Sequence, residues 1–169
     1  MSARKLMAAI AIAAVAAVAV RSIFWSDARL VRRQLGAMAN AASAPANESE
    51  IDRVARAARL SRMMTDGVII RQGASSFVGG RQAVAGWVLQ GVTEFGPFKV
   101  ALSDQRVSLE DARTATVFAT VSLAPDKLGI SPPDPRQVHV TLTKVDGEWL
   151  LSAAEVLRVL EPARSVEGQ

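Results

Sequence analysis

Few residues of this 169-residue chain are suited to acid–base or nucleophilic chemistry. The sequence contains one histidine, His139, and neither cysteine nor tyrosine. Without cysteine there is no thiol nucleophile and no thiolate ligand for a metal ion. His139 lies in residues 138–143, where apolar and polar residues alternate. Because alternate side chains of a strand point to opposite faces, we expect His139 on the polar face, where a lone histidine is usually structural or solvated.

The short motifs that mark common active sites are absent from the sequence. No Gly-x-Ser-x-Gly segment is present, and no serine has a matching set of histidine and carboxylate partners. Gly79 and Gly80 are not followed by a lysine at the spacing of a phosphate-binding loop. We therefore predict no catalytic triad, no metal site and no cofactor.

The charge distribution argues against a nucleic-acid partner, although the pI is about 10.3. Three of the 20 basic residues, Arg4, Lys5 and Arg21, lie in the first 25 residues. The rest of the chain keeps 17 basic residues against all 16 acidic ones, so it is close to neutral. We therefore expect no electrostatic field around this part of the chain that would attract a polyanion such as a nucleic acid.

Residues 1–25 have the composition of a signal anchor or a signal peptide. A short basic start precedes a run without polar residues, 6–20, which matches the apolar region of a signal peptide. Continuing through Arg21 to Trp25 gives about 20 residues, the length of a membrane-spanning helix. Cleavage near Ala17-Val18-Ala19 is the alternative, but we expect an anchor because residues 24–27 run directly into a helix.

Hydrophobic periodicity predicts one α+β domain over residues 26–162 and a flexible tail over 163–169. The first predicted helix begins near Ala28, the second starts at Ser49 and ends around Thr65-Asp66-Gly67, and the third covers 81–93. Residues 73–80 are expected to be a loop. Asp146-Gly147 is a strong signal for a β-hairpin. The predicted strands are 68–72, 98–109, 114–123, 138–143 and 148–160.

The second predicted helix has an apolar side and a basic side. We expect the apolar side to be buried, as in most amphipathic helices; it consists of Ile51, Val54, Ala55 and Ala58. The basic side is expected to be a solvated face, with anionic lipid head groups as the alternative contact; it consists of Arg53, Arg56, Arg59 and Arg62.

Two segments resemble the nuclear transport factor 2-like superfamily, which includes SnoaL-like domains. They are Gly80-Arg81-Gln82-Ala83-Val84, which opens the third helix, and Lys144-Val145-Asp146-Gly147-Glu148-Trp149, which closes a hairpin. The resemblance covers about residues 28–160. It implies a cone-shaped, cystatin-like fold with three helices packed on a curved, mostly antiparallel sheet. The superfamily includes isomerases, dehydratases, cyclases and non-enzymatic proteins, so the resemblance does not imply one function.

The N-terminal segment further resembles uncharacterised bacterial members of this superfamily that carry a membrane anchor. This resemblance implies a single pass through the bacterial inner membrane, formed by residues 6–25. A basic region at the extreme terminus is typical of an export signal, so we expect the domain on the periplasmic side. The count of basic residues in the near flanks favours the cytoplasmic side instead.

The superfamily also suggests where a site would lie. Its catalytic members use an Asp or His inside the cone, and the candidates here are Asp66, at the end of the second helix, and His139. The residues expected to line a ligand pocket in the cone are Trp87, Val117, Val138 and Val140. Sheets of this superfamily often pair into dimers, and the residues expected at such an interface are Phe118 and Thr141.

Three functions remain compatible with these patterns. The first is a membrane-tethered, non-enzymatic interaction domain with an unknown protein partner, as an accessory of an envelope assembly. The second is a carrier or sensor that binds a small apolar ligand in the cone. The third is an SnoaL-like isomerase, dehydratase or cyclase that uses Asp66 or His139.

Overall fold

The computed structural model describes residues 26–73, 76–125 and 134–159, so the expected membrane segment and tail lie outside the described residues. Residues 26–42 are helical, and two helices follow, α2 (Glu50–Arg62) and α3 (Arg81–Phe95). Six strands form one sheet in the order β2-β1-β6-β5-β4-β3. The strands are β1 (Met64–Gln72), β2 (Ser76–Gly79), β3 (Phe98–Leu109), β4 (Thr114–Pro125), β5 (Arg136–Val145) and β6 (Glu148–Val159).

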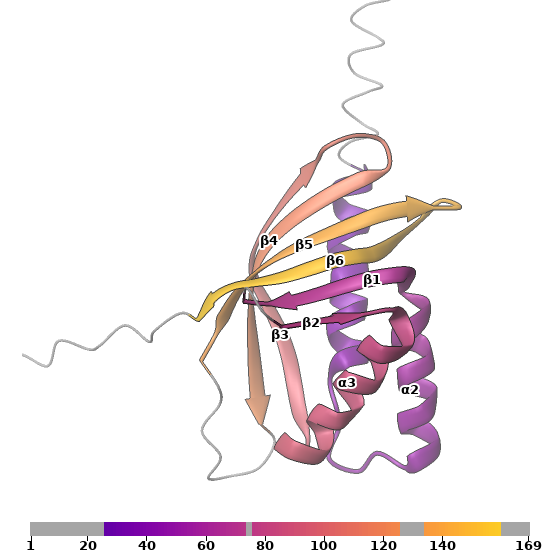
Figure 1. Cartoon of the computed structure of the whole chain (residues 1–169), viewed down its shortest axis with the longest axis vertical. Helices are drawn as coiled ribbons and strands as arrows, with labels where there is room; N and C mark the ends of the chain where they lie inside the picture. The colour runs from indigo at the N-terminus through magenta and orange to yellow at the C-terminus, as the bar shows by residue number, and fades with distance from the viewer. Residues whose placement is uncertain (1–25, 74–75, 126–133, 160–169) are drawn as a thin grey trace, which may run out of the picture.

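The three helices and the sheet share one hydrophobic core. Helix 26–42 lies behind the curved strands in Figure 1 and buries Val31, Leu35 and Met38 in this core. Helices α2 and α3 contribute Leu60 and Val84. The predicted α+β class, with helices first and a meander of strands afterwards, is therefore confirmed. Among the described residues, no helix has the length and apolar character needed to cross a membrane.

The sheet contains one strand that the sequence patterns miss. Strand β2 lies within residues 73–80, which were expected to be a loop, and it pairs antiparallel with β1. Gly73 has a φ of 69°, in the left-handed region that glycine enters without a steric penalty, and it begins the turn between these strands. A four-residue strand next to glycine and serine residues has too little alternation to be recognised from sequence.

Strand β1 is longer than expected and occupies an unexpected place in the sheet. It begins at Met64 rather than at Val68, and it pairs parallel with β6, the last of the described strands. The other strand pairs are antiparallel. The hairpin between β5 and β6 follows the prediction, because Asp146 and Gly147 have φ values of 51° and 88°. Positive φ at both positions is the signature of a type I′ turn.

Helix α2 differs most from its prediction. It begins as expected, because the backbone N–H of Asp52 donates to the Ser49 side chain at 3.2 Å. It ends at Arg62 instead of continuing to Gly67. The apolar side that we expected to be buried is on the surface: Ile51 is 81% exposed and Val54 is 62% exposed. The buried residues of α2 are Arg56, Leu60 and Ser61.

Candidate functional site

The inner face of the sheet buries three of the four residues expected to line a pocket. Val117, Val138 and Val140 belong to the buried core, and Val117 has no exposed surface. Trp87, the fourth expected lining residue, is 49% exposed on α3. Among the described strand residues, Thr120 is the only buried one with a polar side chain. This face therefore resembles a protein core more than a catalytic cavity.

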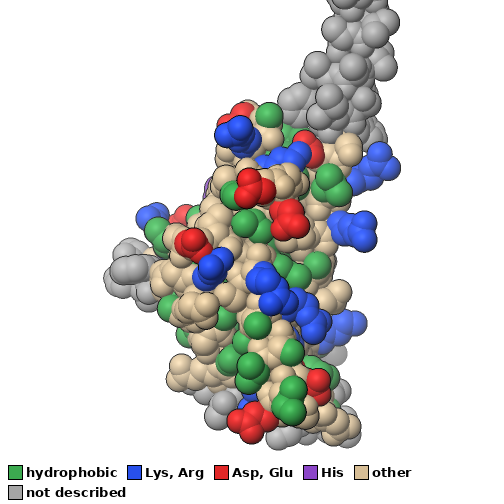
Figure 2. Space-filling view, turned by 90° about the vertical axis from the view of Figure 1, so that its right-hand side faces the viewer, with side chains coloured by type: hydrophobic (Ala, Val, Ile, Leu, Met, Phe, Trp, Pro, Cys, Tyr) green, Lys and Arg blue, Asp and Glu red, His purple; other side chains and the backbone are tan. Residues whose placement is uncertain are grey.

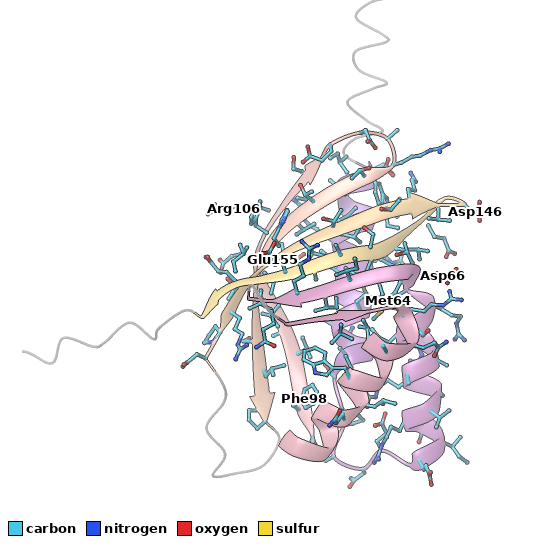
Figure 3. The ribbon with its side chains drawn as sticks, in the orientation of Figure 1. Met64, Asp66, Phe98, Arg106, Asp146 and Glu155 are labelled. Carbon is cyan, nitrogen blue, oxygen red and sulfur yellow. The ribbon has the colours of Figure 1, made fainter. Side chains whose placement is uncertain are left out.

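Asp66 lies at the edge of the molecule (Figure 3). It falls between Met64 and Ile69, where the register between β1 and β6 shifts. Its side chain is 84% exposed and forms an ion pair with Arg81 at the start of α3, with 2.9 Å between Oδ1 and Nη1. Ion pairs between exposed side chains contribute little to stability. In this position Asp66 does not face the packed interior.

His139 lies on the outer face of the sheet, as the alternation predicts. Its ring stacks on Phe118 of the neighbouring strand, with 4.5 Å between ring centroids and 20° between the ring planes. Phe118 is 50% exposed. Thr141 lies on the same face and pairs with Thr116 of β4. Because Asp66 is on β1 and His139 is on β5, with β6 between them, the two catalytic candidates are not brought together.

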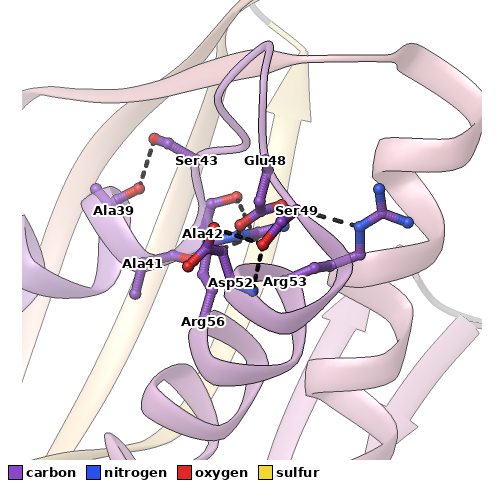
Figure 4. A network of polar contacts seen from close by, with 9 residues as sticks. All are labelled: Ala39, Ala41, Ala42, Ser43, Glu48, Ser49, Asp52, Arg53 and Arg56. Atoms are coloured by element: carbon purple, nitrogen blue, oxygen red, sulfur yellow. Dashed lines mark hydrogen bonds and ion pairs between the residues drawn. The ribbon is translucent and has the colours of Figure 1, made fainter.

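The polar cluster that the sequence analysis missed centres on Arg56 (Figure 4). Its guanidinium donates two hydrogen bonds to Glu48, from Nε to Oε1 at 2.6 Å and from Nη2 to Oε2 at 3.0 Å. Nη1 donates to the carbonyl oxygens of Ala41 and Ala42, the last residues of the first helix, at 3.3 and 3.5 Å. Arg56 thus joins α2 to helix 26–42, and it satisfies carbonyl groups that a helix end leaves free.

An open groove of about 760 Å³ lies next to this cluster, between the first turns of α2 and the start of β3. The buried ionisable groups on its wall, Glu48 and Arg56, satisfy each other. Phe98 forms part of the floor and holds the loop after the first helix through backbone hydrogen bonds with Ala44, at 2.8 and 3.0 Å. The groove therefore has no unpaired buried acid or base among the described residues.

A second, partly buried polar contact lies at the opposite end of helix 26–42. The Lys144 ammonium donates to Asp27 at 2.8 Å and lies 5.3 Å from the centroid of the Trp149 ring. This contact ties the first turn of the helix to β5 and β6. Both the ion pair and the cation–π contact stabilise the packing of the helix against β5 and β6, and this structural role is sufficient to explain them.

The turn between β3 and β4 carries a carboxylate with a lowered pKa. The backbone N–H of Arg113 donates to the Asp111 carboxylate at 2.6 Å, and this hydrogen bond to the charged form lowers the pKa of Asp111. Asp111 is exposed, and its contacts are those of a side chain that closes a turn. In the described part of the chain, no three acidic, histidine or cysteine side chains are close enough to hold a metal ion.

Basic side chains gather on the face shown in Figure 2, which is the side of the molecule where α2 lies in Figure 1. Arg59 and Arg62 of α2 are exposed there, whereas Arg56 is buried and Arg53 lies 3.9 Å from Glu48. Only two of the four arginines expected to form a basic side therefore remain fully available to solvent.

No family model and no curated protein sequence matches the chain. Several solved structures are similar to it. An NTF2-like protein with a cystatin-like fold from Novosphingobium aromaticivorans has a TM-score of 0.67 and 15% identity, and the alignment covers 88% of this chain and 91% of that chain. The hexachlorocyclohexane dehydrochlorinase LinA-type3 from Novosphingobium barchaimii has a TM-score of 0.63 and 11% identity, over 85% and 95% of the two chains. A protein of unknown function from Mycobacterium tuberculosis has a TM-score of 0.65 and 11% identity, over 86% and 83%.

These similarities define the class of fold. The chain has the nuclear transport factor 2-like, cystatin-like fold, with three helices on a six-stranded mixed sheet. At these identities the likeness extends to the fold alone. An enzyme and a protein of unknown function share it, so the activity has to be argued from the side chains of this chain.

Proposed function

We propose that the chain is a membrane-tethered, non-enzymatic interaction domain that binds a protein partner through the outer face of its sheet. The observation that carries the proposal is the contrast between the two faces of β4 and β5. The inner face is apolar and packed, whereas the outer face presents Phe118 half exposed and stacked on His139. Aromatic side chains at the centre of an exposed surface are common anchors of protein contacts.

The two other functions need features that these side chains do not supply. An SnoaL-like enzyme would need Asp66 or His139 inside the cone, and both are on the outside. A carrier of an apolar ligand would need open volume beside Val117, Val138 and Val140, which are buried in the core. These observations favour the interaction function over both.

The tether rests on residues 6–25, whose composition suits a single membrane pass. The described domain follows from residue 26, so a retained anchor would hold it close to the bilayer. An accessory role in an envelope assembly fits such a short connection.

The experiment compares two variants in affinity capture from solubilised membranes. Phe118→Thr removes the exposed ring but keeps a residue with a strong preference for strands. Trp87→Ala is the control, because it removes an exposed aromatic ring from α3. We expect a captured partner that the wild type and Trp87→Ala retain and that Phe118→Thr loses. Equal capture by all three proteins, or no partner above background for any of them, would contradict the proposed function.

A further inference from the structure

The outward side of α2 carries an apolar stripe that the rest of the described chain leaves uncovered. Ile51 is 81% exposed and Val54 is 62% exposed, and Ala55 and Ala58 are exposed beside them. These residues recur at the spacing of three and four that places side chains on one face of a helix. Leu60 packs into the core on the opposite side of α2, so the stripe points away from the domain. We call these four exposed residues the apolar stripe of α2.

Two arginines adjoin this stripe at the end of the helix. Arg62 follows Ala58 by four residues and continues the stripe by one turn, and Arg59 lies beside it. Both arginines are exposed, and no ion pair among the described residues includes either of them. The acidic residues of α2, Glu50 and Asp52, lie at its other end, in the first turn. Figure 2 shows hydrophobic and basic side chains together on the side of the molecule where α2 lies.

The apolar stripe is the more informative part of this surface. Basic residues in the last turn of a helix also complement the helix dipole, so the arginines alone would not indicate a binding partner. Surfaces that bind proteins are enriched in aromatic residues, and the apolar stripe of α2 contains none. A helix that lies on a bilayer places its apolar side chains between the head groups and the acyl chains, and its basic side chains attract anionic lipids. The exposed surface of α2 has both features.

The fold holds α2 within reach of a bilayer. The apolar run 6–20 precedes helix 26–42, and this helix is about 25 Å long. The hydrogen bonds from Arg56 to Ala41 and Ala42 hold α2 against the end of that helix. A tether at residues 6–25 therefore allows α2 to touch the bilayer when helix 26–42 lies along the membrane surface rather than upright on it.

We propose that α2 docks on an anionic bilayer surface, with its apolar stripe below the head groups and with Arg59 and Arg62 against the lipid phosphates. The inference rests on the membrane tether of the proposed function. It goes beyond the tether because it defines an orientation, in which the helices face the bilayer. The outer face of the sheet, with Phe118, then points away from the lipid and stays open to a protein partner.

Quenching of a single labelled cysteine tests this docking, because the chain has no cysteine of its own. Ala58→Cys places an environment-sensitive fluorophore on the apolar stripe. Ser108→Cys places the same fluorophore on an exposed residue of β3, next to Val107, which packs against the core from the inner face. The full-length chain is reconstituted into phosphatidylcholine vesicles, with or without phosphatidylglycerol, whose acyl chains carry a nitroxide quencher. We expect strong quenching at position 58 with phosphatidylglycerol, weaker quenching there without it, and background quenching at position 108.

Two substitutions separate the basic part of the surface from the apolar part. Arg62→Gln should lower the ratio of docked to undocked domains about 5-fold with phosphatidylglycerol and little without it, because each basic residue near an anionic surface contributes about that factor. Ile51→Gln should lower the ratio about 10-fold or more in both kinds of vesicle, because it removes a large apolar side chain from the lipid. Arg106→Gln is the matched control, since it removes an exposed arginine from β3 and should leave the ratio unchanged.

Several results would overturn the inference. Equal quenching at positions 58 and 108, or background quenching at both, would show that α2 does not rest on the lipid. Quenching at position 58 that Arg62→Gln and Ile51→Gln leave unchanged, or that Arg106→Gln weakens equally, would contradict the assigned surface. If position 58 is not quenched while Phe118→Thr still loses a captured partner, the proposed function stands and only this inference falls. Quenching at position 58 without any captured partner would leave the docking and remove the proposed protein contact.

Discussion

Helix 26–42 and helix α2 both carry an apolar stripe of helical period, but only the first of them buries it. Val31, Leu35 and Met38 of helix 26–42 pack into the core, whereas Ile51 and Val54 of α2 face solvent. Helix α2 is held instead by the buried guanidinium of Arg56 and by Leu60. The difference shows that a stripe is buried only where the fold provides a surface to cover it. A helix at the margin of the sheet is docked through polar contacts as well.

The largest loss of stability is expected when the contact between Arg56 of α2 and Glu48 is broken. Arg56→Ala removes both hydrogen bonds that the buried Glu48 carboxylate accepts from the guanidinium and leaves it only Arg53, whose Nε is 3.9 Å away. Loss of one member of a buried ion pair costs about 3–5 kcal/mol. Chemical denaturation followed by circular dichroism would measure the lower free energy of unfolding. Arg59→Ala is the matched control, since Arg59 is exposed on the same helix and its loss should change stability little. Equal stabilities of the two variants would show that the contact does not hold α2.

A somewhat smaller loss is expected from the apolar stripe of helix 26–42. Leu35→Ala removes a buried side chain from the core, which costs about 2–5 kcal/mol, depending on how far the surroundings relax. Leu30→Ala, on the exposed side of the same helix, should cost much less. The same denaturation experiment compares the two leucines. A loss for Leu30→Ala as large as that for Leu35→Ala would mean that the helix is covered on both sides.

The smallest change in stability is expected from a substitution in the apolar stripe of α2. Ile51→Gln replaces an exposed apolar side chain by a polar one with a better helix propensity, so the free energy of unfolding should change by less than about 0.5 kcal/mol. Thermal unfolding of the variant beside the wild type measures this difference. A loss comparable to that of Leu35→Ala would show that Ile51 is covered in solution and would remove the contrast between the two helices.

The parts of the fold that were predictable from sequence are those where pattern and environment agree. Alternation along residues 138–143 correctly separates Val138 and Val140 from His139, because an antiparallel strand with one buried face must alternate. The Asp146-Gly147 turn was predictable because its positive φ values favour these residue types. Strand β2 was not, because its four residues show too little alternation, and the early start of β1 was not, because its parallel pairing with the distant β6 overrides a weak local pattern.

The candidate site was less accessible to prediction than the fold. The outward position of His139 follows from local alternation, but its stacking on Phe118 requires the pairing of β4 with β5. The contact between Arg56 and Glu48 depends on how the loop after the first helix folds back onto α2.

The position of β6 has a consequence for the order in which the molecule can form during synthesis. Strand β6 follows the other five described strands in the sequence, and it lies between β1 and β5, so it joins the two parts of the sheet. Until residues 148–159 have emerged, β1 and β2 have no connection to β3, β4 and β5 through the sheet, and the edges of both parts expose unpaired backbone groups. A nascent chain therefore cannot complete its sheet by folding from the N-terminus. The sheet is complete only when β6 pairs with β1 on one side and with β5 on the other.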